Sequence, residues 1–360
     1  MKRIFLLSVA IALTSSSLFA KVWRINNNIG ITADFTMAQQ AHDNGSVQPG
    51  DTLYFEHSSL TYGGLLLAKS LKLIGAGYFL SANPGVQYTT TAPRLDGITV
   101  VNSAANSVIS VSSTSIFLDS VNNVRISRCW IGGDLTLYGS SNTTISNCFI
   151  NQNISIQAKV FNNSVVCKVT GCAGTSIFNN IIAANLSQEQ MAYGGICTPN
   201  WVMPHSSTVF NNSIFGMANN FTGSFYNNTA VGITLSGGSS ASNNIFYNTI
   251  ASSKRRTYTT PGSYDEVTLE PGNSNQFNFT RESLFTNVVS AQYLDTSWKL
   301  TPGSAAIGAG TGGVDCGATG GNAAFQFGMP PAIPTIYKLN VAPAASGNSI
   351  GVTISTKSNN

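Results

Sequence analysis

The sequence predicts an all-β solenoid, a stack of similar turns built from short strands, and two observations carry this prediction. The first is a repeated six-residue frame. It begins and ends with an apolar residue, and its fourth position is usually Asn. Its fourth position falls, in order, at Cys129, Cys148, Asn163, Asn180, Asn212, Asn228 and Asn244. Successive steps of 19, 15, 17, 32, 16 and 16 residues are typical of a solenoid repeat. The second is the set of short alternating runs between the copies, such as DLTLYG and GITLSG, with no long helical pattern among them.

The first twenty residues predict a secretory signal. Lys2 and Arg3 precede an apolar run from Ile4 to Leu13, and small residues follow up to Ala20. A membrane anchor is the alternative, but it needs about 20 apolar residues and this run breaks at Thr14. We therefore expect a secreted, periplasmic or cell-surface protein with no membrane span in the mature chain.

Composition narrows the possible partners of the mature chain. Without Lys2 and Arg3, 16 basic residues face 14 acidic ones, and only 9% of all residues are charged. Nucleic-acid binding requires a basic stripe, which this sequence lacks. We expect a monomer that binds no nucleic acid.

The recurring asparagines are predicted to form a ladder. In a stack of turns, one position recurs about every 4.8 Å, so an inward Asn can bond to the Asn above and below it. Cys129 and Cys148 would occupy the first two rungs. Their spacing allows a disulfide, but we favour two stacked buried thiols. A bridge between Cys167 and Cys172, five residues apart, is more plausible.

Both ends of the chain resemble a known family. Upstream, DFTMAQQAHDNG predicts a short helix, followed by PGDTLYF and SLKLIGAG; downstream lies LTPGSAAIGAGTGGVDCGATGG. These segments resemble the entry and closing segments of right-handed parallel β-helix proteins of the pectate-lyase-like superfamily, although Cys316 replaces the usual Ile. The resemblance covers residues 21–325 and implies that the helix caps the solenoid. Residues 326–360 are a Pro-rich hinge and a β-type tail, expected to add strands to the last turns or to pack along the side.

The resemblance is specific for the fold and says little about function. Enzymes of this superfamily act mostly on acidic polysaccharides, and the hydrolases show adjacent aspartates and Gly-His-Gly, whereas the lyases show Asp-His and Arg-x-Pro-x-x-Arg. None of these patterns occurs here. Between Val124 and Ile250 the acidic residues are Asp134 and Glu189, too few for a carboxylate calcium site. We expect no metal and no cofactor.

Three groups of residues are candidates for a site, and each has a structural alternative. The segment 185–208 carries Glu189, Tyr193, Trp201 and His205, residue types suited to a sugar site, unless it is an ordinary turn. Trp130 and Phe149 directly follow the ladder; they form an aromatic platform if they face outward and belong to the core if they face inward. The basic cluster is Lys254, Arg255 and Arg256, which could hold a polyanionic glycan or form a solvated loop.

The sequence therefore predicts an exported β-helix protein that is non-catalytic or uncharacterised, with polysaccharide binding as its candidate activity. The alternative is a polysaccharide lyase or glycoside hydrolase acting on uronate-type polysaccharide. In that case Glu189 and His205 are the candidate catalytic residues.

Overall fold

In the computed structural model most of the strands are parallel, and the described part of the chain contains two short α-helices. The described residues are 20–152, 154–157, 159–163, 166–170, 173–183, 186–189, 207–215, 217–221, 223–235, 240–247, 254–260, 263–268, 273–286, 294–331, 333–342 and 349–358. No helix among them is long and apolar enough to cross a membrane.

Three long sheets contain most of the strands. Sheet 1 consists of β1 (Val22–Ile25), β2 (Thr52–Phe55), β4 (Lys72–Ile74), β7 (Val108–Ser110), β10 (Arg125–Ser127), β13 (Thr144–Ser146), β18 (Thr175–Phe178), β21 (Ser207–Phe210), β24 (Gly223–Tyr226) and β27 (Ser240–Ser242). Sheet 2 consists of β5 (Arg94–Leu95), β8 (Ser112–Ser113), β11 (Trp130–Ile131), β14 (Phe149–Ile150), β19 (Ile181–Ile182), β22 (Ser213–Ile214), β25 (Thr229–Ala230), β28 (Ile245–Tyr247) and β31 (Gln276–Phe279). Sheet 3 consists of β3 (Gly64–Leu67), β6 (Gly97–Val101), β9 (Ile116–Asp119), β12 (Leu135–Tyr138), β15 (Ile154–Gln157), β20 (Leu186–Glu189), β23 (Met217–Phe221), β26 (Gly232–Leu235), β29 (Lys254–Thr260) and β30 (Ser263–Thr268).

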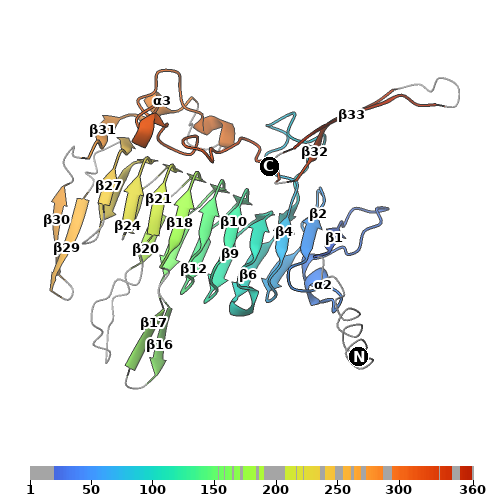
Figure 1. The fold of residues 1–360 in the computed structure, drawn as a ribbon, viewed down its shortest axis with the longest axis horizontal. Coiled ribbons are helices and arrows are strands. Elements are labelled where there is room, and N and C mark those ends of the chain that lie inside the picture. The colour runs from blue at the N-terminus through green and yellow to red at the C-terminus, as the bar shows by residue number, and fades with distance from the viewer. Residues whose placement is uncertain are drawn as a thin grey trace, which may run out of the picture.

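The chain visits the sheets in a fixed cycle. From β4 onward, a strand of sheet 1 is followed by one of sheet 2 and then one of sheet 3, and each circuit pairs in parallel with the circuit before it. Only β29 and β30, at the end of sheet 3, pair antiparallel within these sheets. Figure 1 shows the strands side by side along the long axis of the molecule. This arrangement is consistent with the predicted β-solenoid.

Alternate side chains of the three sheets meet in one hydrophobic core. In sheet 1 the aligned residues Ile126, Ile145, Ile177 and Val209 are all fully buried. Inward residues of sheet 2, such as Ile131, and of sheet 3, such as Leu135, join the same cluster. The alternation arises because successive side chains of a strand point to opposite faces.

The Asn-Asn pairs form the corner between sheet 1 and sheet 2, and the two residues of each pair differ in backbone conformation and in burial. The first Asn of each pair adopts a left-handed conformation, with φ between 52° and 55° at Asn179, Asn211, Asn227 and Asn243. Asn tolerates this region better than most residues because its short side chain bonds locally. The second Asn of each pair points inward and is fully buried, at Asn180, Asn212, Asn228 and Asn244.

The predicted ladder is confirmed, with a different set of rungs. The side-chain amide Nδ2 of each Asn donates to Oδ1 of the next at 3.0, 3.0, 3.2 and 2.9 Å, along Asn180, Asn212, Asn228, Asn244 and Asn275. Asn275 is a rung that the sequence frame missed. The backbone N–H of Cys148 donates to Asn180 Oδ1 at 2.9 Å, so the ladder passes directly from Cys148 to Asn180.

The prediction that Asn163 is a rung is wrong. Asn163 ends β16 (Lys159–Asn163), which pairs antiparallel with β17 (Val166–Thr170) in a hairpin between β15 and β18. The error has a physical reason, because Asn-rich turns between alternating apolar runs also favour hairpins. The 32 residues from Cys148 to Asn180 therefore form one turn that carries an inserted hairpin.

The predicted N-terminal helix is present as α2 (Ala38–Asp43). Ala38 and Ala41 on its buried face belong to the main core. A one-turn 3-10 helix, η1 (Asn102–Ala104), follows β6. In Figure 1, α2 lies beside β1 and β2, where the stack begins.

A C-terminal strap, residues 281–286 and 294–331, leaves the stack and runs back along it, as Figure 1 shows in orange and red. It contains α3 (Arg281–Leu284), η2 (Asp295–Trp298) and η3 (Thr311–Gly313). Beyond it, β32 (Thr335–Val341) and β33 (Val352–Lys357) form an antiparallel hairpin. The tail was expected to add strands to the last turns or to pack along the side. The first alternative is wrong, because this hairpin pairs within itself and joins none of the three long sheets; it projects beside the early strands.

Candidate binding site

The column that directly follows the ladder faces outward from the main core. In sheet 2, Trp130 is aligned with Phe149, and Phe149 with Ile181. Their neighbours Ile131 and Ile150 point inward and belong to the main core, so the column itself lies on the outer face of the sheet. The orientation that sequence reasoning left open is thus outward.

The strap covers most of this outer face. Phe149, Ile181 and Ile245 of sheet 2 share a second hydrophobic cluster with Trp298 and Phe325 of the strap. Phe149 is fully buried in this cluster, whereas Trp130 is partly buried at its edge. Of the two aromatic residues, Trp130 is therefore the one that a ligand can contact, because Phe149 is covered by the strap.

In three of the corner pairs the first Asn, at Asn179, Asn227 and Asn243, anchors the strap. Asn179 Nδ2 donates to the carbonyl oxygens of Ala318 and Gly320 at 2.8 and 2.6 Å. Asn227 Oδ1 accepts from the backbone N–H of Thr311 at 3.0 Å, and Asn243 Nδ2 donates to Thr311 Oγ1 at 2.9 Å. One Asn column thus stabilises the interior and its neighbour fixes the strap outside.

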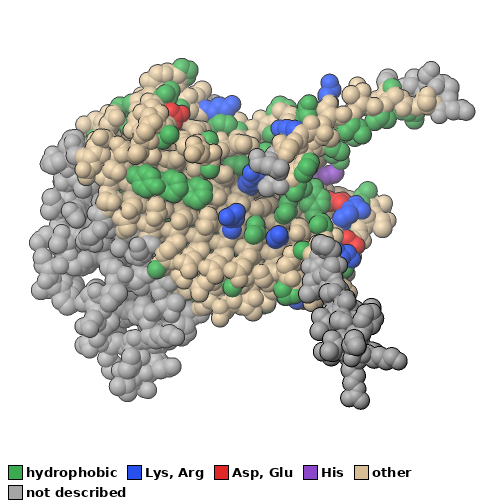
Figure 2. Space-filling model, in the orientation of Figure 1, with side chains coloured by type: hydrophobic (Ala, Val, Ile, Leu, Met, Phe, Trp, Pro, Cys, Tyr) green, Lys and Arg blue, Asp and Glu red, His purple; other side chains and the backbone are tan. Residues whose placement is uncertain are grey.

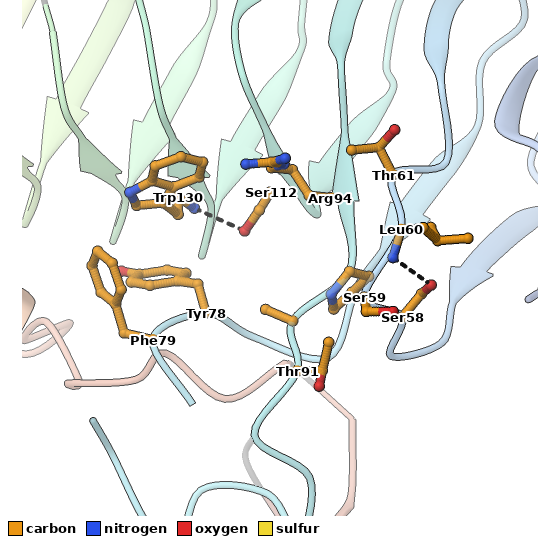
Figure 3. A pocket seen from close by; sticks show the side chains of 12 residues that line it. Ser58, Ser59, Leu60, Thr61, Tyr78, Phe79, Thr91, Arg94, Ser112 and Trp130 are labelled. Atoms are coloured by element: carbon orange, nitrogen blue, oxygen red, sulfur yellow. Dashed lines mark hydrogen bonds between the residues drawn. The ribbon is translucent and has the colours of Figure 1, made fainter. Parts of the chain in front are cut away.

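Where the strap ends, the outer face of sheet 2 opens into a pocket with a volume of about 340 Å³. This volume is at the small end of ligand-binding sites. Figure 3 shows Trp130, Ser112 and Arg94 from the neighbouring strands β11, β8 and β5 along one side. The residues that line the pocket are Ser58, Ser59, Leu60, Thr61, Tyr78, Phe79, Thr91, Ala92, Pro93, Arg94, Ser112 and Trp130.

An excursion of the chain, residues 75–93, provides the aromatic wall. The ring centroid of Phe79 lies 6.4 Å from that of Trp130 and 5.2 Å from that of Phe149, both in edge-to-face geometry. Phe79 has a φ of 48°, an unusual backbone conformation for a bulky residue. Such strain persists only where surrounding contacts enforce it, and it is frequent at functional sites.

A buried carboxylate holds this wall against the strap. Asp295 Oδ1 accepts from Asn83 Nδ2 at 3.2 Å, and its Oδ2 accepts from the backbone N–H of Gly328 at 2.5 Å. Burial raises the pKa of Asp295, although these hydrogen bonds partly offset the effect. Burial also raises the pKa of Tyr78 well above its usual value, so this phenol stays neutral.

The polar groups around the pocket are hydroxyls and one cation. Ser112 Oγ accepts from the backbone N–H of Trp130 at 3.3 Å, and Thr61 Oγ1 donates to Asp96 Oδ2 at 3.0 Å. Arg94 is exposed and forms no ion pair with the residues that the structure describes. The described lining includes no carboxylate and no imidazole. The pocket can stack a ring on Trp130 and bind an anion through Arg94, but its lining provides no general acid–base pair.

The other predicted site residues lie elsewhere or outside the described residues. Glu189 ends β20 in sheet 3, and its side chain is not among those described. Tyr193, Trp201 and His205 lie outside the described residues altogether. The basic cluster Lys254, Arg255 and Arg256 begins β29, also in sheet 3, again without described side chains. Glu189 and the basic cluster thus belong to sheet 3, whereas the pocket lies on the outer face of sheet 2.

Sequence reasoning missed Tyr78, Phe79 and Arg94. A signal was present, because nineteen residues separate β4 from β5, whereas one separates β7 from β8 and two separate β10 from β11. Long connections often carry function.

A second aromatic column lies on the outer face of sheet 1. Phe178, Phe210 and Tyr226 stack on successive strands, with centroid separations of 4.9 and 5.2 Å and interplanar angles of 12° and 4°. All three are partly exposed, and Figure 2 shows an elongated hydrophobic patch over β18, β21 and β24. Because the rings stack on one another along the sheet, the column presents mainly ring edges to solvent, which suits sugar stacking less well than the face of a single ring.

The thiols are structural. Cys129, Cys148 and Cys316 are free and buried, which confirms the predicted thiols at Cys129 and Cys148. Burial raises the pKa of Cys129 well above its usual value, so its thiolate is not populated near neutrality. The predicted Cys167–Cys172 bridge is untested, since Cys172 lies outside the described residues. Within the described part of the chain, no three His, Cys, Asp or Glu residues cluster as a metal site.

Comparison of this chain with protein-family models, with curated proteins and with solved structures gives no match in any of the three.

Proposed function

We propose that this protein is an exported right-handed parallel β-helix protein, similar to the pectate-lyase-like superfamily and capped by α2, that binds acidic polysaccharide in the pocket between Trp130 and Arg94. The long parallel sheets and the N-terminal signal support the architecture and the export. The observation that carries the function is the combination of a partly buried indole and an exposed guanidinium on one small pocket.

The chemistry of the two groups supports a charged sugar. An indole packs well against the apolar face of a pyranose ring, and a guanidinium binds a carboxylate through two parallel hydrogen bonds. The hydroxyls around them suit the hydroxyl groups of a sugar. Binding without cleavage is the favoured activity, because the described lining contains no carboxylate or imidazole and burial keeps the Tyr78 phenol neutral, which leaves general acid–base catalysis without a base there.

The test is retention of the mature protein by immobilised polygalacturonate, alginate and a neutral glucan, with release of new reducing ends measured in parallel. We expect binding of the acidic polymers, weakened by salt, and no new reducing ends. Trp130→Ala should weaken binding about tenfold, the equivalent of about 1.4 kcal/mol. Phe117→Ala is the matched control, because Phe117 is an exposed aromatic residue of sheet 3.

The variant Arg94→Gln tests whether the pocket prefers acidic polysaccharides to neutral ones. This variant should lose affinity for the acidic polymers and much of its salt dependence, whereas Arg125→Gln, an exposed arginine of sheet 1, should not. Equal binding by wild type and Trp130→Ala would remove the pocket from consideration. Release of reducing ends from any polymer would show that the protein is an enzyme.

A further inference from the structure

The C-terminal hairpin, β32 with β33, is amphipathic. Leu339 is paired with Ile354 and Val341 with Val352, so these four side chains share one face, which Ile350 extends toward the tip. The intervening pairs, Lys338 with Ser355 and Asn340 with Thr353, give the opposite face a polar surface. A two-stranded sheet normally shows this alternation when one of its faces is covered.

None of the described residues covers the apolar face of this hairpin. The exposed fractions are 43% for Leu339, 53% for Val341, 59% for Ile350, 53% for Val352 and 56% for Ile354. Figures 1 and 2 show the hairpin projecting from the body with hydrophobic side chains along its length. Together these side chains form one apolar patch, and the largest such patch on a monomeric protein, typically about 300–600 Å², is often functional.

The base of the hairpin is fixed, so the face has a defined position. The backbone N–H of Tyr88 donates to the Ile336 carbonyl at 2.9 Å, and Lys357 Nζ donates to the Gly85 carbonyl at 3.2 Å. A lone two-stranded hairpin is marginally stable in water, and it gains independent stability when its apolar face packs on another element.

We propose that the apolar face of this hairpin, Leu339, Val341, Ile350, Val352 and Ile354, packs against the same face of a second copy of this chain, which makes the protein a homodimer. The face carries no charge, and the nearby Lys338 lies on the opposite face, so a two-fold axis through it brings no like charges together. Five side chains per copy make a small interface compared with the about 20–30 residues a side of a standard one, so we expect a weak dimer that forms as the protein concentration rises.

Other occupants fit the face less well. A glycan needs hydrogen-bond partners and aromatic rings, and this face is aliphatic. An anionic membrane surface would favour basic residues beside the apolar side chains, whereas Lys338 points away. The inference replaces the monomer expected from the sequence and does not depend on the ligand of the pocket.

The experiment is sedimentation equilibrium of the mature full-length protein over a wide concentration range, with two double variants. Val341→Lys with Val352→Lys places two charges on a cross-strand pair of the apolar face and should weaken dimerisation about a hundredfold or more. The matched control, Asn340→Lys with Thr353→Lys, places the same charges on the pair of the polar face and should leave the dimer intact.

Two further measurements do not depend on a variant. In the wild type, hydrogen exchange of residues 350–357 should slow as the protein concentration rises through the dimerisation range. Vesicles of neutral and of anionic lipid should not bind the wild-type protein. A wild type that stays monomeric at every concentration, dimers that survive Lys on the apolar face, or a monomer that binds vesicles through Val352 would each overturn the proposal.

Discussion

Replacing Asn212 by alanine removes one rung from the middle of the asparagine ladder. Its Oδ1 accepts from both the backbone N–H and Nδ2 of Asn180 at 3.0 Å, and its Nδ2 donates to the Ile177 carbonyl, the Phe210 carbonyl and Asn228 Oδ1 at 2.9, 2.9 and 3.0 Å. All five bonds are lost in the variant, and because Asn212 is fully buried, water does not replace them at once.

The cost depends on which groups lose every partner. Asn180 Nδ2 keeps the carbonyls of Ile145 and Phe178, and Asn228 Oδ1 keeps the backbone N–H of residue 212. The backbone N–H of Asn180 has no other acceptor in the described part of the chain. A buried unsatisfied donor costs about 1–3 kcal/mol, and the remaining lost bonds and the small cavity add about 1 kcal/mol. We expect a loss of about 3 kcal/mol in the free energy of unfolding.

Urea unfolding followed by circular dichroism measures this loss, and hydrogen exchange locates it at the amide of Asn180. The matched control is Asn322→Ala, the same change at an exposed position of the strap, which should alter stability by less than about 0.5 kcal/mol. The reasoning is refuted if the two variants are equally stable, or if Asn212→Ala is less stable while exchange at Asn180 is unchanged.

Three further predictions concern other parts of the molecule. Burial raises the pKa of Asp295, so the folded protein holds a proton that the unfolded chain releases near pH 4. The difference in unfolding free energy between wild type and Asp295→Asn should therefore fall as pH rises from about 4 through the raised pKa, by at most about 1.4 kcal/mol per pH unit. A difference that stays constant or rises with pH would contradict a raised pKa at Asp295. Gly223 has a φ of 125° and lies directly against the Ser207 carbonyl, so Gly223→Ala should cost more than about 2 kcal/mol in urea unfolding, whereas Gly45→Ala, with open space around it, should change little. Phe210→Ala removes the middle ring of the stack on sheet 1 and should cost about 2 kcal/mol in the same assay, which a change below about 0.5 kcal/mol would contradict.

The interior of the stacked sheets was predictable because its determinants are local and periodic. An inward polar residue at a fixed interval must find a partner in the next turn, and Asn180, Asn212, Asn228 and Asn244 follow that rule. The same sequence signal misassigned Asn163, since an Asn-rich turn serves a hairpin equally well. Asn275 was missed because residues around it depart from the apolar frame.

The pocket was only partly predictable, because long-range packing creates it. Trp130 was a candidate from its place after the ladder, but whether it is covered depends on the path of the strap more than a hundred residues later. Tyr78 and Phe79 reach Trp130 from an excursion that is held by Asp295 and Gly328. No periodicity in the sequence encodes those contacts.

The Asn-Asn corner determines where this chain can lengthen. From Cys148 onward, the connection between sheet 1 and sheet 2 is two residues in every turn, locked by the ladder on the inside and, over several turns, by the strap on the outside. The hairpin of β16 and β17 and the link from β20 to β21 follow strands of sheet 3, and the hairpin of β29 and β30 lies at the end of that sheet. Added residues there disturb no rung, whereas one residue added at the Asn-Asn corner would shift a buried amide out of line. Peptides grafted into this scaffold should therefore be tolerated after sheet 3, at intervals of about 4.8 Å along the stack.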